Sequence, residues 1–330
     1  MKNLIITDNY ELWKYLFSEN GDIIGFPYNG FKKGSISFFI YKITHSKKIG
    51  RPFLAQWNNY VINKWEKKNN SKIILFLNPA IWSWYMHEDF LKQLKKRNVK
   101  LVLLMLDSMS TMRKEFSNKI LYMSSYFEII YTFDFNDAKK YNWIYTQMYY
   151  SKLSNIKPIG SKYDVLCICY AGNRIKKLIQ IWDILKSKGI NCFFAISGLS
   201  NEEIKNNYRE GIIYNHYFSY GEIISRVQHT NVILEITQSN QSGYTLRTFE
   251  SVCYNKKLLT NNPLIYKFKF YEDKFMKCFS NIEDLYKLDL EFFCKDECID
   301  YHYNDEFSPK KLFRDINLRL IKNKKEKCKD

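Results

Sequence analysis

The stretch from residue 231 to residue 262 constrains the fold of this chain more than any other. It opens with an apolar run, 232–236, which is typical of a buried strand. A polar turn that contains a glycine follows at 239–243, and the segment 245–254 then has helical periodicity. A second apolar step at 258–259 predicts the next strand. Strand, polar loop, helix and strand in this order form one repeat of a parallel α/β sheet.

This arrangement suits an anionic ligand. A helix that starts at Thr245 presents backbone N–H groups and the positive end of its dipole to the loop before it. Ser242 and Thr245 add hydroxyl groups, and Glu250 has the chemistry to accept hydrogen bonds from a ribose. Arg247 lies three residues before Glu250, where it can bind phosphate or pair with that carboxylate. An ordinary α/β crossover with a surface Arg–Glu pair fits the same pattern.

Strands and helices alternate along the rest of the chain, which indicates parallel sheets covered on both faces. The polar stretch 154–162, with one proline and one glycine, reads as a linker, after which the alternation restarts. We therefore predict two α/β domains, residues 1–155 and 163–305, and a basic helix and tail, residues 306–330. The other expected strands are 4–7, 22–26, 72–77, 100–106, 128–132, 164–169, 191–196 and 211–214. The other expected helices are 11–18, 35–49, 58–68, 89–97, 136–140, 174–186 and 220–227.

The formal net charge of +17 favours an anionic partner such as nucleic acid, an acidic membrane surface or an anionic substrate. A lysine-rich composition without any such partner gives the same charge. No apolar run is long enough to span a membrane, and the first residues lack the apolar core of a secretory signal. We therefore expect a soluble, cytoplasmic protein. Four of the eight cysteines fall inside expected strands or helices, as buried free thiols do: Cys167, Cys169, Cys192 and Cys253.

Several segments resemble bacterial glycosyltransferases that build capsular polysaccharide and lipopolysaccharide. The segments QSG, TLRTFE and KKLLTNN between residues 241 and 262 are similar to the donor-site segment of these enzymes. Further segments that resemble the same family are 131–141, 163–178 and 217–236, so that the resemblance covers about residues 70–280. It implies the GT-B fold, in which two Rossmann-like domains with parallel sheets face each other across a cleft.

The resemblance also implies roles for the residues of the 231–262 stretch. Glu250 would hold the ribose of a nucleotide sugar, and Ser242, Gly243 and Thr245 would face its diphosphate. The commonest retaining GT-B enzymes carry a second glutamate eight positions earlier. Residue 242 is a serine here, so retention of the anomeric configuration is not implied.

A second group of candidate donor ligands follows the first strand of the second domain. Gly172 permits close approach of the backbone, and Arg174 can bind a diphosphate through two parallel hydrogen bonds. In the enzymes that this chain resembles, a basic residue in this loop meets the donor phosphates. The alternative for Arg174 is an ordinary place in the first turn of a surface helix. Arg247 is the other candidate phosphate ligand.

The candidate acceptor residues lie in the first domain. Asp107 and Ser108 follow the strand 100–106, and ligands of α/β proteins bind at such strand ends. Asp107 is a candidate general base for an acceptor hydroxyl, and a turn or cap aspartate is the alternative. His87 lies among aromatic residues that can stack on a sugar or form a core edge. Asp134 is expected to cap the helix after it.

No metal site is predicted. Cys294, Cys298 and His302 are four residues apart and would share one helical face, but no fourth ligand has a recognisable spacing. The resemblance implies transfer without a metal and without any cofactor besides the nucleotide-sugar substrate.

The resemblance thus implies a hexosyltransferase-type enzyme that moves a sugar from a nucleotide-diphosphate sugar to a glycan acceptor, in the synthesis of surface polysaccharide. The acceptor is expected to be lipid-linked, and the basic surface would keep the protein in peripheral contact with the inner face of an anionic membrane. No nucleic acid partner is expected. The alternatives are a basic nucleic-acid-binding protein and a catalytically degenerate GT-B protein that only binds a glycan.

Overall fold

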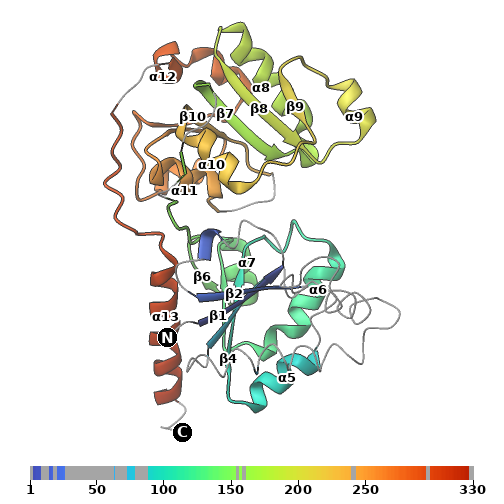
Figure 1. The fold of residues 1–330 in the computed structure, drawn as a ribbon, viewed down its shortest axis with the longest axis vertical. Coiled ribbons are helices and arrows are strands. Elements are labelled where there is room, and N and C mark those ends of the chain that lie inside the picture. The colour runs from blue at the N-terminus through green and yellow to red at the C-terminus, as the bar shows by residue number, and fades with distance from the viewer. Residues whose placement is uncertain are drawn as a thin grey trace. The chain divides into compact units, whose positions relative to one another are not determined.

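The chain folds into two compact units, each with its own sheet (Figure 1). Unit 1 comprises Met1–Ser151 and Ser308–Asp330, and unit 2 comprises Lys152–Phe307. The computed structural model describes residues 3–8, 15–17, 21–26, 63, 73–78, 88–153, 156–157, 161–238, 243–294 and 298–326. The helices expected at 35–49 and 58–68 lie outside these residues, except for residue 63.

The sheet of unit 1 is entirely parallel, with the strand order β2-β1-β3-β4-β5-β6. Its central strands β3 and β4 are buried along nearly their whole length, because their apolar side chains alternate between two covered faces. The strands are β1 (Asn3–Asp8), β2 (Gly21–Phe26), β3 (Ile73–Leu77), β4 (Lys100–Met105), β5 (Ile129–Thr132) and β6 (Ile144–Tyr145).

Local sequence explains where one helix of unit 1 begins and ends. Asp134 accepts hydrogen bonds from the backbone N–H groups of Asn136 and Asp137, which confirms the predicted cap. The same helix ends at Asn142, which adopts a left-handed conformation with φ of 54°. The helices of unit 1 are α5 (Glu88–Lys96), α6 (Lys114–Met123), α7 (Phe135–Tyr141) and α13 (Pro309–Glu326).

Helix α13 follows unit 2 in the sequence but is attached to unit 1. Its residues Leu312 and Ile316 are fully buried. The hydroxyl of Tyr131, in β5, donates a 2.7 Å hydrogen bond to Asp315, which also pairs with Arg319 one turn later. These contacts join the end of the chain to the sheet of unit 1. No helix among the described residues is both long enough and apolar enough to cross a membrane.

The sheet of unit 2 also has six parallel strands, in the order β12-β11-β10-β7-β8-β9. Strand β10 lies between β11 and β7, with Leu258 beside Ile233 and Ile233 beside Leu166. The strands are β7 (Tyr163–Tyr170), β8 (Cys192–Ser197), β9 (Ile212–Tyr214), β10 (Thr230–Glu235), β11 (Lys257–Thr260) and β12 (Met276–Cys278).

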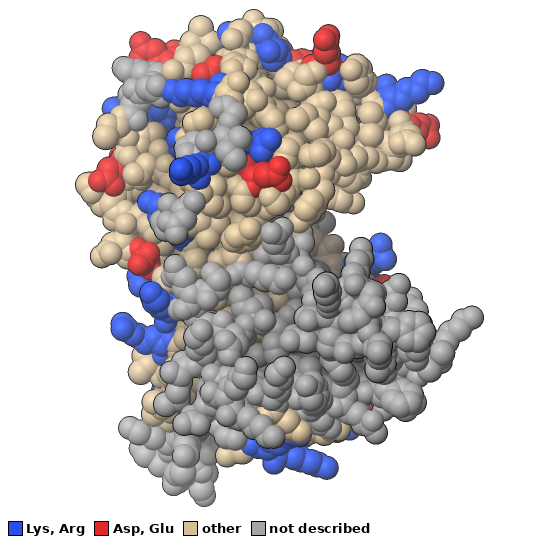
Figure 2. All heavy atoms as spheres, in the orientation of Figure 1, with Lys and Arg blue, Asp and Glu red and all other residues tan. Residues whose placement is uncertain are grey.

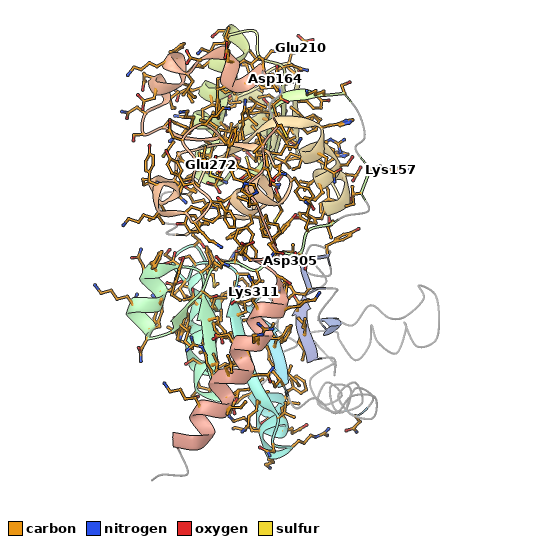
Figure 3. The ribbon with its side chains drawn as sticks, turned by 90° about the vertical axis from the view of Figure 1, so that its left-hand side faces the viewer. Lys157, Asp164, Glu210, Glu272, Asp305 and Lys311 are labelled. Atoms are coloured by element: carbon orange, nitrogen blue, oxygen red, sulfur yellow. The ribbon has the colours of Figure 1, made fainter. Side chains whose placement is uncertain are left out.

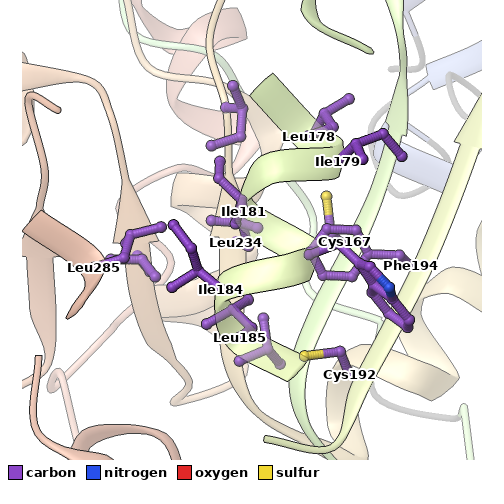
Figure 4. Packing of buried hydrophobic residues seen from close by; sticks show 14 of the residues in the cluster. Cys167, Leu178, Ile179, Ile181, Ile184, Leu185, Cys192, Phe194, Leu234 and Leu285 are labelled. Atoms are coloured by element: carbon purple, nitrogen blue, oxygen red, sulfur yellow. The ribbon is translucent and has the colours of Figure 1, made fainter. Parts of the chain in front are cut away.

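Helices cover both faces of this second sheet. On one face, Leu178 and Ile181 of α8 pack with Leu234 of β10 in a continuous core (Figure 4). The next residue of β10, Glu235, contacts α11, and neighbouring strand residues point to opposite faces, so α11 covers the other face. The helices are α8 (Ile175–Ser187), α9 (Asn201–Asn206), α10 (Tyr220–Gln228), α11 (Leu246–Cys253) and α12 (Leu290–Cys294).

Candidate functional site

The candidate donor residues gather at the carboxyl edge of the unit 2 sheet. Strands β7, β10 and β11 are parallel, so their last residues, Tyr170, Glu235 and Thr260, lie at the same edge. The loops that carry the candidate residues begin here, and ligands of open α/β sheets bind at this kind of edge. Ser242 lies in residues 239–242, outside the part of the chain that the structure describes.

Arg174 ties the loop after β7 to the end of β10. Its Nη1 donates to the carbonyl oxygen of Ile236 and its Nη2 donates to that of Tyr170. Its Nε donates to the carbonyl of Ala171 at 3.1 Å. These three acceptors are neutral, so they fix the guanidinium in place without neutralising its positive charge. A charged guanidinium forms stronger hydrogen bonds to an anion than a neutral donor does.

Gly172 also brings the two loops together. It has a φ of +52°, which side chains other than glycine rarely adopt, and it begins a short 3-10 helix, Gly172–Arg174. A Cβ atom at this position would lie 3.9 Å from the side-chain amide nitrogen of Gln238, which follows β10. The backbone after β7 therefore approaches the loop after β10.

Thr245 is the N-cap of α11. Its hydroxyl accepts a 3.1 Å hydrogen bond from the backbone N–H of Arg247 and donates to Glu235. The hydroxyl group of Thr245 therefore donates its proton to Glu235 and not to a ligand. Gly243, two residues earlier, is buried, and its carbonyl accepts a 2.8 Å hydrogen bond from the side chain of Asn262. Both contacts set the position at which α11 begins.

Glu250 is fully buried, with an exposed fraction of 0%. Its Oε1 accepts a 2.9 Å hydrogen bond from the hydroxyl of Tyr220, and its Oε2 pairs with Arg247. Burial raises the pKa of Glu250, while the positive charge of Arg247 and the hydrogen bond from Tyr220 oppose this shift. The carboxylate predicted to hold a ribose thus orients Arg247 in this structure.

Arg174 and Arg247 influence a common neighbour. Cys169, near the end of β7, has a lowered pKa, first because Cys167 hydrogen-bonds to it and then because of the charges of the two arginines. The positive charges of Arg174, in the loop after β7, and of Arg247, in the first turn of α11, therefore both act on this part of the carboxyl edge. The charge of Arg174, whose partners are neutral, can attract an anionic ligand to this edge.

Sequence reasoning missed Glu235, the last residue of β10. This buried carboxylate accepts hydrogen bonds from the hydroxyls of Thr245, Thr248 at 2.8 Å, and Thr260 at 2.5 Å. It therefore connects the ends of β10 and β11 to the first turn of α11. The signal in the sequence is an acidic residue inside an apolar run, which is costly to bury unless it has partners.

The candidate acceptor residues lie at the carboxyl edge of the unit 1 sheet. Asp107 follows β4, and its Oδ2 accepts a 3.2 Å hydrogen bond from the amide of Asn78, which follows β3. Asn78 is itself fixed, because its Oδ1 accepts a 2.6 Å hydrogen bond from the backbone N–H of Leu106. Asp107 is half-buried, so its carboxylate is partly accessible. The Asn78 side chain at the end of β3 holds this carboxylate at the end of β4.

Ser108 has less access to a ligand than the sequence suggested. It is 2% exposed, and its hydroxyl lies 2.9 Å from that of Ser110. The buried Asp137 also receives a hydrogen bond from Ser108, and burial raises the pKa of Asp137. In this structure Ser108 organises the loop after β4. His87 lies outside the described residues.

The cysteines and the histidine considered for zinc do not share a helix. Helix α12 ends at Cys294, and His302 has a left-handed φ of 52° outside any helix, so the expected helical alignment was wrong. Among the described residues, no group of three or more metal-binding side chains has the geometry to hold an ion. All the described cysteines are free thiols.

No protein-family model and no curated protein sequence matches this chain. Solved structures are similar to it along most of its length. A putative UDP-N-acetylglucosamine 2-epimerase from Listeria monocytogenes has a TM-score of 0.54 and 10% identity, with 97% of each chain covered. The UDP-GlcNAc 2-epimerase of Methanocaldococcus jannaschii, in complex with UDP-GlcNAc and UDP, has a TM-score of 0.50 and 12% identity, covering 96% of this chain and 100% of its own.

An α-glucosyltransferase in complex with UDP-glucose and DNA with an abasic site is also similar. Its TM-score is 0.50 at 12% identity, with 87% of this chain and 89% of that chain covered. At these identities the likeness reports the fold. The chain has the GT-B fold, with two Rossmann-like α/β units, and this confirms the predicted fold class. Its structural neighbours are GT-B enzymes that use sugar nucleotides.

Proposed function

We propose that this protein is a glycosyltransferase that binds a nucleotide-diphosphate sugar at the carboxyl edge of the unit 2 sheet. The observation that carries the proposal is the Arg174 guanidinium, which three carbonyl groups hold at this edge, with Gly172 beside it and Arg247 in the first turn of α11. A cation held by neutral groups, a second arginine and a helix N-terminus suit the negative charge of a diphosphate. The UDP and UDP-sugars present in the similar structures support the same ligand class.

The same groups would promote the reaction. When the bond from the sugar to the diphosphate breaks, negative charge grows on the leaving oxygen, and a fixed cation there lowers the barrier. Arg174 is fixed by three carbonyl groups and Arg247 by Glu250, so neither side chain has to reorganise during the reaction. We propose that these arginines and α11 neutralise the leaving group in place of a metal ion.

Asp107 is the proposed general base for the acceptor hydroxyl. Its carboxylate is half-buried and is oriented by Asn78, whose own amide is fixed by the backbone of Leu106. A base held in this way would be aligned to accept a proton from a sugar hydroxyl. The acceptor proposed is a lipid-linked glycan, as in the synthesis of bacterial surface polysaccharide.

Helix α13 supports a membrane-bound acceptor. Its exposed face carries cations and two large apolar side chains, Leu318 and Ile321, which are 61% and 55% exposed. Lys311 lies in the first turn of this helix (Figure 3), and the other exposed residues of the face are Lys310, Arg314, Asn317 and Lys322. A basic helical face with exposed apolar residues is typical of peripheral binding to anionic lipid.

A first experiment tests ligand class and reaction together. UDP-GlcNAc, UDP-glucose and the corresponding GDP and TDP sugars are screened for stabilisation of the protein against heat, because selective binding raises the melting temperature. Release of nucleoside diphosphate is then followed with and without lipid-linked glycans from bacterial membranes, in the presence and absence of EDTA. Release that depends on the acceptor and resists EDTA is the expected result.

Three other outcomes would overturn parts of the proposal. Conversion of the nucleotide sugar to its epimer, without release of diphosphate, would make the protein an epimerase like two of its structural neighbours. Binding of a glycan without turnover of any sugar nucleotide would indicate a degenerate glycan-binding protein. Loss of activity in EDTA would indicate that a metal ion, and not the arginines alone, neutralises the leaving group.

The nucleic-acid alternative has its own test. On the face shown in Figure 2, the Lys and Arg side chains of unit 2 are scattered among Asp and Glu. A scattered distribution predicts weak binding to DNA, whereas a DNA-binding protein would have an affinity that falls steeply with salt. Tight, salt-sensitive DNA binding in a filter or polarisation assay would favour this alternative, and two similar structures do contain DNA.

A further inference from the structure

Tyr170 is an exposed aromatic residue at the end of a buried strand. It is the last residue of β7, whose Leu166 and Cys167 are almost fully buried, yet the Tyr170 side chain is 61% exposed. Its backbone carbonyl is one of the three acceptors that fix Arg174. The ring therefore belongs to a residue whose backbone holds the proposed phosphate ligand.

A glycine supports the ring of Tyr170 on one side. Gly198 follows β8, the neighbouring strand, and has a φ of +82°. A Cβ atom on residue 198 would lie 2.0 Å from Cε2 of Tyr170, well inside van der Waals contact. Both the backbone conformation and the ring contact therefore require glycine here. The exposed Tyr170 ring lies directly against the backbone of the β8 loop.

The β8 loop is itself held in place. The side chain of Asn215, after β9, accepts a 3.0 Å hydrogen bond from the backbone N–H of Leu199 and donates a 2.6 Å hydrogen bond to the Leu199 carbonyl. The backbone N–H of Ala171 donates to the carbonyl of Ser197 at 2.8 Å. A hydrogen bond between backbone groups thus joins the loop that supports the Tyr170 ring to the residue that follows Tyr170.

We infer that Tyr170 is a stacking platform for the base of the nucleotide whose diphosphate is bound by Arg174. This inference rests on the proposed function. A flat π-surface that is fixed on one side and open to solvent can stack on a nucleobase, and such stacking is tolerant of the identity of the base. The platform and Arg174 lie on the same short segment, Tyr170–Arg174, so one loop contacts both parts of the nucleotide.

The test compares a ligand that has a base with one that lacks it. UDP, GDP, ADP and TDP are first titrated into the wild type by calorimetry, and the nucleotide that binds most tightly is chosen. The affinity for inorganic pyrophosphate is then measured from its displacement of this nucleotide. Stacking on one aromatic ring is worth about 5-fold to about 150-fold in affinity. Tyr170→Ala should lose this factor for the nucleotide and keep the pyrophosphate affinity, while Tyr170→Phe should bind like the wild type.

Two further variants complete the experiment. Gly198→Ala should weaken nucleotide binding as Tyr170→Ala does, because the added methyl group displaces the ring. Tyr286→Ala, at an equally exposed tyrosine elsewhere in unit 2, is the control and should leave binding unchanged. In saturation-transfer NMR, the base protons should receive magnetisation from the wild type and much less from Tyr170→Ala. Melting temperatures verify that each variant is folded.

The outcomes separate this inference from the proposed function. If Tyr170→Ala binds the nucleotide as tightly as the wild type while Arg174→Ala does not, the platform is wrong and the donor site stands. Equal losses for nucleotide and pyrophosphate would make Tyr170 a structural residue and overturn the inference. The corresponding nucleotide sugar is titrated in parallel, and a loss confined to it would place the sugar ring on the tyrosine and overturn the inference as well. If none of the four nucleotides binds the wild type, both proposals fail.

Discussion

The hydroxyl of Tyr220 donates a 2.9 Å hydrogen bond to a carboxylate oxygen of Glu250, and Arg247 pairs with the other oxygen. Glu250 belongs to α11 and is completely buried where this helix contacts Tyr220 of α10, although the sequence suggested that it would face a ribose. Burial is the largest influence on this group and raises its pKa. The charged carboxylate is therefore less favourable in the folded chain than in the unfolded chain.

The raised pKa of Glu250 gives a first prediction, on stability against pH. Between the unfolded value near 4.5 and the higher folded value, the folded state binds more protons than the unfolded state. The stabilising contribution of Glu250 is therefore complete below pH 4.5 and falls as the pH rises through the folded pKa. In urea denaturation, the free energy of unfolding of the wild type relative to Glu250→Gln should decrease over this pH range.

A control with the opposite sign is available in the same unit. Hydrogen bonds from the backbone and hydroxyl of Ser200 lower the pKa of Glu203, an exposed residue in α9. Its small contribution should be present above the unfolded pKa and disappear as the pH falls. A difference between the wild type and Glu250→Gln that does not vary with pH would show that Arg247 and Tyr220 cancel the effect of burial, and a difference that increases with pH would show that they outweigh it.

The parts of the fold that sequence could predict are those with a local signal. Strands β4, β7 and β10 are long apolar runs, and α11 has a clear apolar period, so all four were expected within a few residues of their bounds. Helix α6 was missed, because its sequence KEFSNKILYM mixes polar and apolar residues and has only Ile120 and Met123 buried. A helix with two buried residues leaves too weak a pattern to detect.

The candidate site could be predicted only in its residues, not in their contacts. Arg174 and Gly172 were found because a loop after a strand is a known place for ligands. The partner of Glu250, Tyr220, is 30 residues away in the sequence, and Thr260 is 25 residues from Glu235. Such pairs depend on how helices and strands pack, and a single sequence does not encode that pairing in any local pattern.

Arg174 gives a second prediction, on nucleotide affinity. Arg174→Ala removes a charge that three carbonyl groups hold at the carboxyl edge. Hydrogen bonds to charged groups are worth about 1.5–3 kcal/mol, so the affinity for a nucleoside diphosphate should fall roughly 10-fold to 150-fold in calorimetry. Arg174→Lys should recover little of it, since an ammonium cannot reproduce the planar set of contacts.

The matched control is another arginine of unit 2. Arg209 pairs with Asp183 at 2.8 Å, and both side chains are well exposed, so Arg209→Ala should change neither nucleotide affinity nor stability by much. Equal losses in the two alanine variants would mean that general positive charge attracts the nucleotide. That result would remove Arg174 from the site.

A third prediction concerns the hydroxyl groups around Glu235. Thr248→Val keeps the shape of the side chain but removes the 2.8 Å hydrogen bond to this buried carboxylate. A buried charge with one partner fewer costs about 1–3 kcal/mol in the free energy of unfolding, measured by chemical denaturation. Thr111→Val, whose hydroxyl contacts a backbone carbonyl at an exposed position, should cost much less. Similar costs for both variants would contradict a special role for Glu235.

A fourth prediction separates catalysis from binding at Asp107. If this carboxylate is the general base, Asp107→Asn should lower kcat by about 100-fold to 10,000-fold and leave nucleotide affinity unchanged. Asn78→Ala should also lower kcat, by a smaller factor, because it frees the carboxylate from its 3.2 Å hydrogen bond. Asp89→Asn, in the exposed first turn of α5, is the control. An unchanged kcat in Asp107→Asn would exclude the base.

The last prediction concerns the exposed face of α13 and anionic membranes. Each cation close to such a surface contributes about 1 kcal/mol, so Lys311→Gln combined with Arg314→Gln should weaken binding by about 2 kcal/mol, or roughly 30-fold. Binding is measured by co-sedimentation with vesicles that contain about one third phosphatidylglycerol. Both positions are exposed, so the melting temperature should not change.

The control removes the same charge from other parts of unit 1. Lys96→Gln with Lys139→Gln changes two exposed lysines, one in α5 and one in α7, and should leave vesicle binding nearly intact. Leu318→Ser should weaken binding further in the α13 variant, because an apolar side chain that is 61% exposed inserts between lipids. Equal losses in the two double variants would mean that net charge, rather than α13, attracts the protein to the membrane, and the acceptor would then have to be sought in solution.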